Sequence, residues 1–236
     1  PRRYRVAPPD LRGGRRYQPG GRQVVGGVGD AREFCGLRDY RPGDPLRHIE
    51  WRAWARTGRP VVREYQEEYL MRLGLVLDSF LGDRDPELFE EAVSVCASHV
   101  EALAGGEGLI DLMFVGTEAI HLSSGRGTTD QRRLLEVLAC AEPCRDAPFE
   151  ALTALLSRHQ ERLSSCICVL LDWDGPRREM VRWLRSRGVP LQVLVLHEED
   201  APPPDPGPMA DRPRHLLPLP LGRVAEGLAR HGGGMR

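Results

Sequence analysis

The stretch "RLGLVLDS" at residues 72–79 decides the fold, and "SCICVLLD" at residues 165–172 repeats its pattern. Both are short apolar runs that end in a carboxylate, and neither alternates apolar with polar residues. Strands that are apolar on both sides are typical of a parallel sheet covered by helices on both faces. A third run, "PLQVLVLHEE" at residues 190–199, predicts another buried strand. These runs therefore predict a central sheet of parallel strands.

Helices are predicted in the segments between these strands. Residues 85–106 place apolar side chains at helical spacing after Pro86 and end at two glycines. Three further helices are predicted at residues 129–141, 148–163 and 176–188. Two further strands are predicted at residues 109–116 and 118–125, and a hairpin-like turn at Gly116 and Thr117 joins them. Alternating helices and continuous apolar strands predict a doubly wound α/β sandwich.

Changes in composition divide the chain into four segments. Residues 1–69 are predicted to be an N-terminal extension made of a basic arm, β structure and a short helix. The first 30 residues hold seven arginines against two aspartates and many glycines, which is typical of a poorly ordered arm. Residues 70–200 are predicted to form the α/β domain, residues 201–213 a proline-rich surface linker, and residues 214–236 a strand and a helix that pack on the domain.

Composition excludes several classes of function. The net charge is −1, which favours neither nucleic acid nor a membrane surface as a partner. The chain contains no lysine, and this excludes P-loop and Schiff-base chemistry. The six cysteines lack the paired spacing of a zinc site, so we interpret them as reduced thiols. No apolar run approaches the ~20 residues of a membrane span, so we expect no membrane contact by this part of the protein.

The segment "YRPGDPLRHIEWRAWAR" at residues 40–56 combines a tight turn with a predicted short helix. Proline and glycine at the two central positions suit a turn, because glycine accepts a positive φ. Asp44 suits the N-cap of a helix over residues 45–56, and Gly58 suits its end. The β-rich residues 60–69 then lead into the first strand of the sheet.

Trp51 and Trp54 lie three residues apart in this predicted helix and can cover one face of it. We favour the interpretation that both tryptophans are core residues with arginine stems lying over them. The alternative is an arginine and tryptophan surface that binds a phosphate or the acidic segment of a partner.

Residues 33–79 resemble the bacterial domain of unknown function fifty-eight family, whose signature runs F-x-G-L-R-x-Y-x-P-G-D-x-x-R-x-I-x-W-x-x-x-A-R. The matching residues are Phe34, Gly36, Leu37, Arg38, Tyr40, Pro42, Gly43, Asp44, Arg47, Ile49, Trp51, Ala55 and Arg56, and Trp54 lies among them. The resemblance implies a von Willebrand factor A-like α/β domain and association with a MoxR-type AAA+ ATPase. It also implies a membrane-anchored N-terminus in many full-length members and a role as an assembly partner, not an enzyme.

The resemblance further implies a Mg²⁺ site at the carboxyl edge of the sheet, built from an Asp-x-Ser-x-Ser loop, a threonine and a later aspartate. Asp78 and Asp172 match the two aspartates, but Phe80 and Gly82 stand at the serine positions, and "CRDAPFE" offers no threonine. Asp78 and Asp172 either hold a weak, unconventional metal or bond to loop amides and arginines. We favour the second interpretation and expect no cofactor.

The function expected from the sequence is a non-enzymatic protein-interaction or assembly module. The alternative is a Mg²⁺-dependent, adhesion-type ligand binder that uses Asp78 and Asp172. A hydrolase is the weakest candidate, because the chain shows no nucleophile elbow and no ordered set of catalytic residues. We expect the protein to lie in the cytoplasm, with a full-length form anchored at the inner membrane.

Overall fold

The computed structural model describes residues 2–6, 32–44, 46–67, 72–103, 109–124 and 128–232. The chain divides into two compact units. One consists of Pro1–Tyr17 and Met71–Arg236 and is called the α/β unit below. The other consists of Gln18–Leu70 and is called the hairpin unit. Among the described residues no helix is long and apolar enough to cross a membrane.

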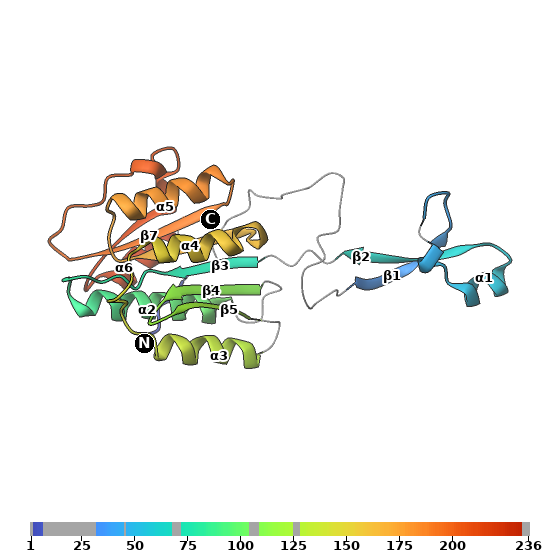
Figure 1. Ribbon diagram of the computed structural model, residues 1–236, viewed down its shortest axis with the longest axis horizontal. Helices are drawn as coiled ribbons and strands as arrows, with labels where there is room; N and C mark the ends of the chain where they lie inside the picture. Colours follow the sequence, from blue (N-terminus) through green and yellow to red (C-terminus); the bar gives the residue numbers. More distant parts are fainter. Residues whose placement is uncertain are drawn as a thin grey trace. The chain divides into compact units, whose positions relative to one another are not determined.

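A six-stranded sheet forms the centre of the α/β unit (Figure 1). Its strands are β3 (Arg72–Leu77), β4 (Leu109–Val115), β5 (Ala119–Ser123), β6 (Ser165–Leu170), β7 (Leu191–His197) and β8 (Leu216–Pro220), in the order β5-β4-β3-β6-β7-β8. Only β5 is antiparallel to its neighbour. The first strand of the sheet is central and the chain winds outward from it on both sides, which is the doubly wound arrangement. The predicted α/β fold is therefore confirmed.

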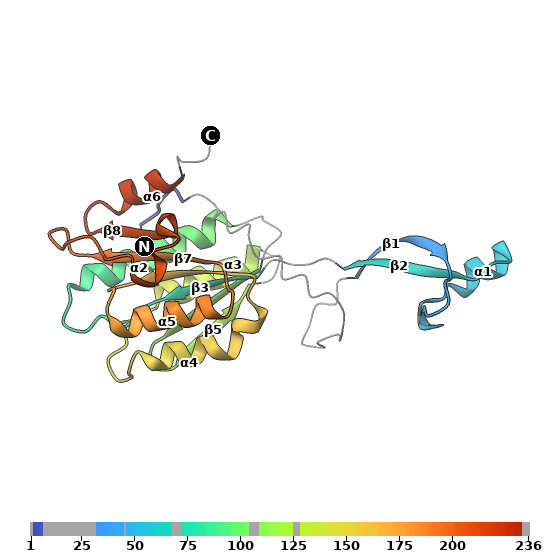
Figure 2. The ribbon, with the colours of Figure 1, turned by 90° about the horizontal axis from the view of Figure 1, so that it is seen from above.

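Helices cover both faces of this sheet, as Figures 1 and 2 show. Helices α2 (Pro86–Ala102), α3 (Thr128–Ala139) and α6 (Val224–Gly232) pack with one apolar cluster on one face. Helices α4 (Glu150–His159) and α5 (Gly175–Ser186) pack with a second cluster on the other. The strands contribute to both clusters alternately, because successive side chains of a strand point to opposite faces. This explains why the strand sequences are apolar throughout.

The predicted hairpin between the second and third strands of the sheet is confirmed. Strands β4 and β5 are antiparallel, with Val115 opposite Ala119 and Asp111 opposite Ser123. The Gly116 amide donates to the carbonyl oxygen of Glu118 at 2.9 Å and closes the turn. The hairpin places β5 at the edge of the sheet.

The proline-rich segment at residues 201–213 is packed against the α/β unit. Its 3₁₀ helix, Gly207–Met209, buries Met209 in the cluster that includes α5. The indole Nε1 of Trp173 donates to the carbonyl oxygen of Asp205 at 2.6 Å. After a second 3₁₀ helix, Pro213–His215, strand β8 pairs with β7 and completes the sheet. The α/β unit thus continues well beyond residue 200.

Residues 2–6, assigned from the sequence to a poorly ordered arm, lie along α2. The Arg2 amide donates to Ser94 Oγ and the Tyr4 amide to Ser98 Oγ, both at 2.9 Å. The Arg2 guanidinium bonds to Glu91 Oε1 at 2.6 Å. The prediction of an arm is wrong for these residues, because the serines on α2 supply acceptors for a backbone that would otherwise need water. The rest of the predicted arm, at residues 7–30, lies outside the described residues.

The hairpin unit pairs β1 (Arg32–Asp39) with β2 (Val61–Glu67) in antiparallel register, with a bulge between Phe34 and Gly36. The predicted β extension is therefore present. The connection from residue 40 to residue 60 contains a 3₁₀ turn, Leu46–His48, and helix α1, Trp51–Thr57.

The single helix predicted at residues 45–56 is wrong, because Ile49 interrupts it. Ile49 forms an isolated bridge with Val62, and the Glu50 amide donates to the carbonyl oxygen of Val61 at 2.9 Å. These bonds hold the backbone extended, so α1 begins only at Trp51 with Glu50 as its N-cap. The predicted end at Gly58 is confirmed, since Gly58 adopts φ 69° and its amide caps the Trp54 carbonyl at 2.8 Å.

Candidate functional site

The carboxyl edge of the sheet brings together the ends of β3 and β6. These strands are parallel neighbours, with Leu77 opposite Val169. The Asp78 amide donates to the Val169 carbonyl oxygen at 2.9 Å and extends the ladder by one residue. In a doubly wound sheet, ligands bind at this edge, at the point where the strand order reverses. The two aspartates predicted from the sequence, Asp78 and Asp172, both lie at this edge.

Asp78 is fully buried, and both of its oxygens accept hydrogen bonds. Oδ1 accepts from the Phe80 amide at 2.9 Å, within the loop that follows β3. Oδ2 accepts from the Leu171 amide at 3.0 Å and from Nε of Arg177 at 2.6 Å. Because two of these donors lie after β6, the carboxylate ties the ends of the two strands to each other.

Arg177 lies in the first turn of α5 and supplies the positive charge beside Asp78. Its side chain is only 4% exposed. One terminal nitrogen donates to Asp174 Oδ2 at 2.7 Å and the other to the Phe80 carbonyl oxygen at 2.8 Å. The guanidinium carbon also lies 4.8 Å from the centre of the Phe149 ring. Burial lowers the pKa of Arg177, but the charges of Asp78 and its acidic neighbours outweigh this, so the pKa lies above its ordinary value.

Asp172 occupies the end of β6 and is partly exposed. Its Oδ1 accepts from the Trp173 amide at 2.6 Å, and its Oδ2 forms an ion pair with Arg84. The Leu171 amide, one residue earlier, binds Asp78, so the structure brings the two predicted aspartates to the same part of the edge. In the structure, both carboxylates accept from loop amides and from arginines.

The residues around Asp78 and Asp172 do not fit a divalent cation. Mg²⁺ requires oxygen ligands at about 2.0–2.1 Å in octahedral geometry. The loop offers the buried aromatic ring of Phe80 and the positive-φ Gly82 where hydroxyl ligands would be needed. Ser79 is near in sequence, but its hydroxyl donates to the Val115 carbonyl. Within the described ranges, no group of three or more His, Cys, Asp or Glu side chains could hold a metal ion.

A pocket of about 440 Å³ adjoins the Arg84–Asp172 pair. Trp173 and the prolines of residues 202–204 form part of its wall. Its lining residues, all of which lie in the described part of the chain, include no serine, threonine or cysteine. The pocket therefore lacks the nucleophile that a hydrolase of the Ser or Cys type requires.

The signature residues at the start of the connection form an ion pair that closes a turn. Arg38 donates from both terminal nitrogens to the two oxygens of Asp44, at 2.7 and 2.8 Å. Asp44 Oδ2 also accepts from the Arg41 amide at 2.8 Å, across a turn in which Gly43 has φ 106°. Asp44 thus closes the Pro42-Gly43 turn and is not the N-cap of α1, so that prediction is wrong.

The ion pair changes the acidity of Asp44. Hydrogen bonds from Arg38, and then from the Arg41 amide, lower the pKa of Asp44 from 3.8 to about 2. The Tyr40 amide donates to the Pro60 carbonyl oxygen at 2.9 Å and joins the two ends of the connection. These contacts give Arg38, Tyr40 and Asp44 a structural part in the hairpin unit.

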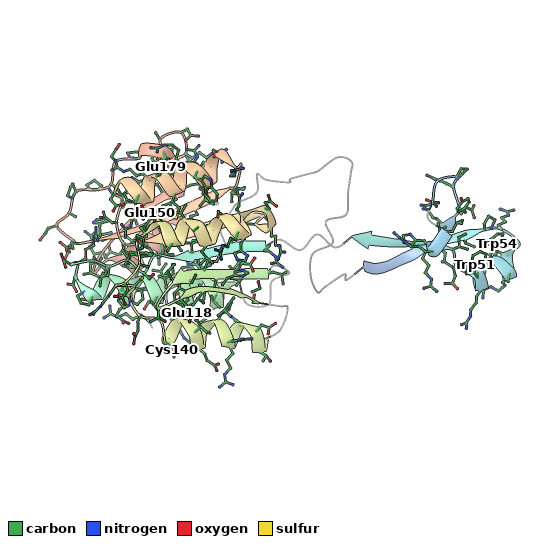
Figure 3. The ribbon with its side chains drawn as sticks, viewed as in Figure 1. Trp51, Trp54, Glu118, Cys140, Glu150 and Glu179 are labelled. Carbon is green, nitrogen blue, oxygen red and sulfur yellow. The ribbon has the colours of Figure 1, made fainter. Side chains whose placement is uncertain are left out.

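The two tryptophans of the signature region form an exposed pair on α1, labelled in Figure 3. Their rings are stacked, with centroids 5.3 Å apart and an interplanar angle of 19°. Trp51 is 62% exposed, and Trp54 is partly buried. The favoured interpretation of both residues as core is wrong for Trp51, because the small hairpin unit has no second layer among its described residues to cover this ring.

The connection that carries the tryptophan pair is also rich in arginine. Arg41, Arg52, Arg56 and Arg59 are exposed, and the last three form no ion pair with the described residues. Arg47, also exposed, donates to His48 Nε2 at 3.4 Å. The signature residues therefore form two groups. One is the Arg38–Asp44 ion pair, and the other is the exposed, arginine-rich connection at residues 40–60, called the tip below.

Sequence reasoning missed a second buried polar cluster at the opposite end of the strands. Asp111 is buried in β4 and accepts from Arg72, from Ser123 and from His121 Nε2 at 3.2 Å. The His121 ring stacks on His159 at 3.8 Å. Burial first, and then the nearby His121, lower the pKa of His159. One sequence signal was visible, since Asp111 is a lone charge in the otherwise apolar "LIDLMFV".

Arg177 and Arg84 were also missed as site residues. Arg177 follows the helix-starting Asp174-Gly175-Pro176 run, and this position in the first turn of α5 points it toward the sheet edge. No local pattern identifies its partner, because Asp78 lies 99 residues earlier in the chain.

The fold and this edge define a class: a doubly wound α/β domain that carries an arginine between its strand ends. The family described as "Protein of unknown function DUF58" matches residues 36–211, and the chain belongs to this family. The match spans the hairpin connection and most of the α/β unit, so the resemblance seen in the signature residues is confirmed.

Two bacterial relatives extend this comparison. The chain is 26% identical over 181 residues to Rv1480, an uncharacterized protein of Mycobacterium tuberculosis, covering 72% of this chain and 56% of the relative. It is 29% identical over 105 residues to YeaD, an uncharacterized protein of Bacillus subtilis, covering 44% of this chain and 25% of the relative. The chain thus spans a quarter to just over half of the length of these relatives.

A solved structure titled as a von Willebrand factor type A from Catenulispora acidiphila is similar to this chain with a TM-score of 0.40 and 10% identity. The similarity covers 73% of this chain and 44% of that chain.

Proposed function

We propose that the protein is a non-enzymatic interaction module that binds a protein partner through the tip of its hairpin unit. One observation carries the proposal. Among the described residues, the large hydrophobic side chains that are exposed are Leu37 at 45%, Leu46 at 67% and Trp51 at 62%, and all three lie in the hairpin unit. In the described part of the α/β unit, no large hydrophobic side chain is exposed.

Exposed aromatic side chains of this kind are typical of binding surfaces. Burying an aromatic ring contributes strongly to association, and Trp and Arg are enriched among the residues that dominate interface energies. The stacking of Trp51 on Trp54 fixes the ring that a partner would meet, because it limits the rotamers of Trp51. A preformed aromatic surface loses less conformational freedom on binding.

The charges at the tip indicate the chemistry of the partner. Residues 36–63 contain seven arginines and three carboxylates, and two of the arginines pair with Asp44 and Glu50. The remaining positive charge favours a partner surface in which carboxylates surround apolar side chains. Leu37 and Leu46, which are exposed in the same unit, favour a protein over a nucleic acid, which would offer these aliphatic side chains no apolar counterpart.

The family resemblance suggests a MoxR-type AAA+ ATPase as this partner, and we propose that the two proteins meet in the cytoplasm. The absence of catalytic activity is part of the proposal. It is supported by the buried edge, where the carboxylates of Asp78 and Asp172 are bound to arginines and are not available as general bases.

Binding of the whole chain to a MoxR-type ATPase from the same organism, measured by calorimetry, tests this proposal. We expect Trp51→Ala to weaken the affinity about 10-fold to 100-fold, the range of interface hot spots. The double variant Arg52→Glu, Arg56→Glu should weaken binding further at low salt. The matched control Arg132→Glu, Arg133→Glu reverses two exposed arginines on α3 and should leave affinity unchanged. Equal binding by all variants contradicts the proposal, as does tighter binding of a single-stranded oligonucleotide.

A further inference from the structure

We propose that Arg177 is a built-in cation that replaces the divalent metal at the carboxyl edge of the sheet, and that the edge is therefore independent of metal. The proposal concerns the α/β unit alone and is separate from the partner proposed for the hairpin unit. Two observations support it: the oxygens that surround the guanidinium group of Arg177, and the hydrogen bonds that Asp78 and Asp172 already accept.

Three oxygens from two segments converge on the guanidinium. Nε donates to Asp78 Oδ2 at 2.6 Å, and the two terminal nitrogens donate to Asp174 Oδ2 at 2.7 Å and to the Phe80 carbonyl oxygen at 2.8 Å. The first and third oxygens belong to the loop after β3, and the second belongs to the N-cap residue of α5. A set of anionic and carbonyl oxygens around one buried cation is what a metal site provides, but here the cation is covalently part of the chain.

The dimensions of this set suit a guanidinium and not a small ion. Each oxygen contacts a different nitrogen of a planar, fork-shaped group, so the oxygens are spread around that group. Mg²⁺ would require its ligands at about 2.0–2.1 Å from a single point. The Phe149 ring lies over the guanidinium carbon at 4.8 Å and offers a π face, which attracts an organic cation and provides no ligand oxygen.

Both predicted metal ligands already accept hydrogen bonds at each of their two oxygens. Asp78 accepts backbone amides at each oxygen in addition to Arg177, and such bonds are lost if a metal draws the carboxylate away. Asp172 accepts the Trp173 amide and pairs with Arg84. A second cation would also be repelled by the guanidinium, because Coulomb interactions are strong in a buried site.

Arg177 consequently performs the structural work that a metal would otherwise do. It joins the loop after β3 to the start of α5 through Asp78, Phe80 and Asp174, and Asp78 in turn accepts from the Leu171 amide after β6. Because the cation cannot dissociate, the conformation of the edge does not depend on metal concentration. Any partner that contacts this edge does so without completing a metal coordination shell.

Metal titration of the wild-type chain provides the first test. We expect calorimetry to show no binding of Mg²⁺ or Mn²⁺ alone, and we expect the unfolding midpoint to be the same in millimolar Mg²⁺, Mn²⁺ or EDTA. A ligand that binds only the native state raises its stability, so even weak specific binding would appear as a shift. Saturable one-to-one binding that Asp78→Asn abolishes would overturn the proposal.

The second test removes the guanidinium. Arg177→Ala should lower the unfolding midpoint by about 10 °C, because it leaves the Asp78 charge buried without its partner. The matched control is Arg178→Ala, which removes the next guanidinium on the same helix, and we expect a much smaller shift, since the Arg178 side chain is 36% exposed.

A chemical rescue identifies the cation that the vacated oxygens prefer. Low-millimolar guanidinium chloride should raise the midpoint of Arg177→Ala more than equal concentrations of ammonium chloride or MgCl₂. Stronger rescue by Mg²⁺ would show that the oxygens prefer a metal.

A further variant keeps the test decisive if Arg177→Ala does not fold. Arg177→Lys retains the positive charge but loses the planar guanidinium group with its three nitrogens. This variant should fold with an unfolding midpoint between those of the wild type and Arg177→Ala, and the midpoint should remain insensitive to Mg²⁺. A midpoint equal to that of the wild type would mean that the three-oxygen geometry is unimportant, and it would overturn the assignment. The wild-type titration stands independently of both variants.

Discussion

At the scale of single residues, the signature motif contains side chains that hold the hairpin unit together and side chains that face outward. Arg38 and Asp44 form a two-bonded pair that closes the turn at Gly43, whereas Trp51 is exposed on α1. A bidentate guanidinium–carboxylate pair restricts both partners in orientation as well as in distance. The pair therefore positions the backbone from which the exposed residues project.

The acidity of Asp44 is a direct consequence of this pair. We expect an NMR titration of the carboxyl carbon to give Asp44 a pKa of about 2, because Arg38 and the Arg41 amide stabilise the charged form. A folded-state pKa below the unfolded value means that the stabilisation is present above pH 4 and is lost as the pH falls toward 2. Tryptophan fluorescence of α1 should change over the same range.

Arg38→Ala provides the control for this titration. It removes the hydrogen bonds from the Arg38 guanidinium, which are the largest cause of the shift, so the pKa of Asp44 should rise toward 3.8. The turn at Gly43 should remain in place. An unchanged Asp44 pKa in Arg38→Ala would show that the ion pair is absent in solution.

Local sequence information located Asp78 and Asp172 but not the residue between them. A carboxylate at the end of an apolar strand lies at the sheet edge by geometry, so the two positions could be predicted from strand ends alone. Arg177 could not be predicted, because its role depends on a fold that brings residues 99 positions apart into contact. In the sequence, Arg177 is one of two adjacent arginines in an arginine-rich helix, and nothing local distinguishes them.

At the scale of elements, the strands and helices of the α/β unit could be predicted because their periodicity is strong. The connection at residues 40–60 could not, because a tertiary contact overrides local preference there. Ile49 has the spacing of a helical residue, yet its bridge to Val62 on β2 holds the backbone extended and delays α1 until Trp51. A helix of this length has little intrinsic stability to resist such pairing.

Strand β3 offers an element-scale prediction at Gly74. A Cβ at this position would lie 2.8 Å from Leu163 Cδ1 and 3.3 Å from Cys166 Sγ, both of which are buried. Gly74→Ala should therefore overpack the space between β3 and β6 and cost about 1–3 kcal/mol of unfolding free energy. Chemical denaturation with urea measures this loss.

Gly116→Ala is the matched control, since its added Cβ would meet atoms no nearer than 3.9 Å. We expect that variant to change the unfolding free energy by no more than about 0.5 kcal/mol. If Gly74→Ala and Gly116→Ala were equally stable, then the close approach of Leu163 to β3 would not constrain this strand.

At the scale of the whole molecule, the hairpin unit is an insertion and not a simple N-terminal extension. Residues on both sides of Gln18–Leu70 belong to the α/β unit. Residues 2–6 contact α2 through Ser94 and Ser98, and β3 then forms the centre of the sheet. The sequence did not reveal this organisation, because the arginine-rich composition of the first residues conceals their packing.

An insertion of this kind should be removable, which gives the last prediction. Replacing residues 18–70 by a short Gly/Ser linker should leave the α/β unit folded, because its sheet, both apolar clusters and the Arg177 contacts lie outside the removed segment. The unfolding midpoint should match that of the whole chain and a near-ultraviolet circular dichroism signal from buried Trp173 should remain, while binding to the MoxR-type ATPase should be lost. Deleting residues 1–6 from the same variant is the informative control, and it should lower the midpoint by removing the Arg2–Glu91 pair and the bonds to α2. Loss of the Trp173 signal in the linker variant would show that the α/β unit depends on the hairpin unit for its folding.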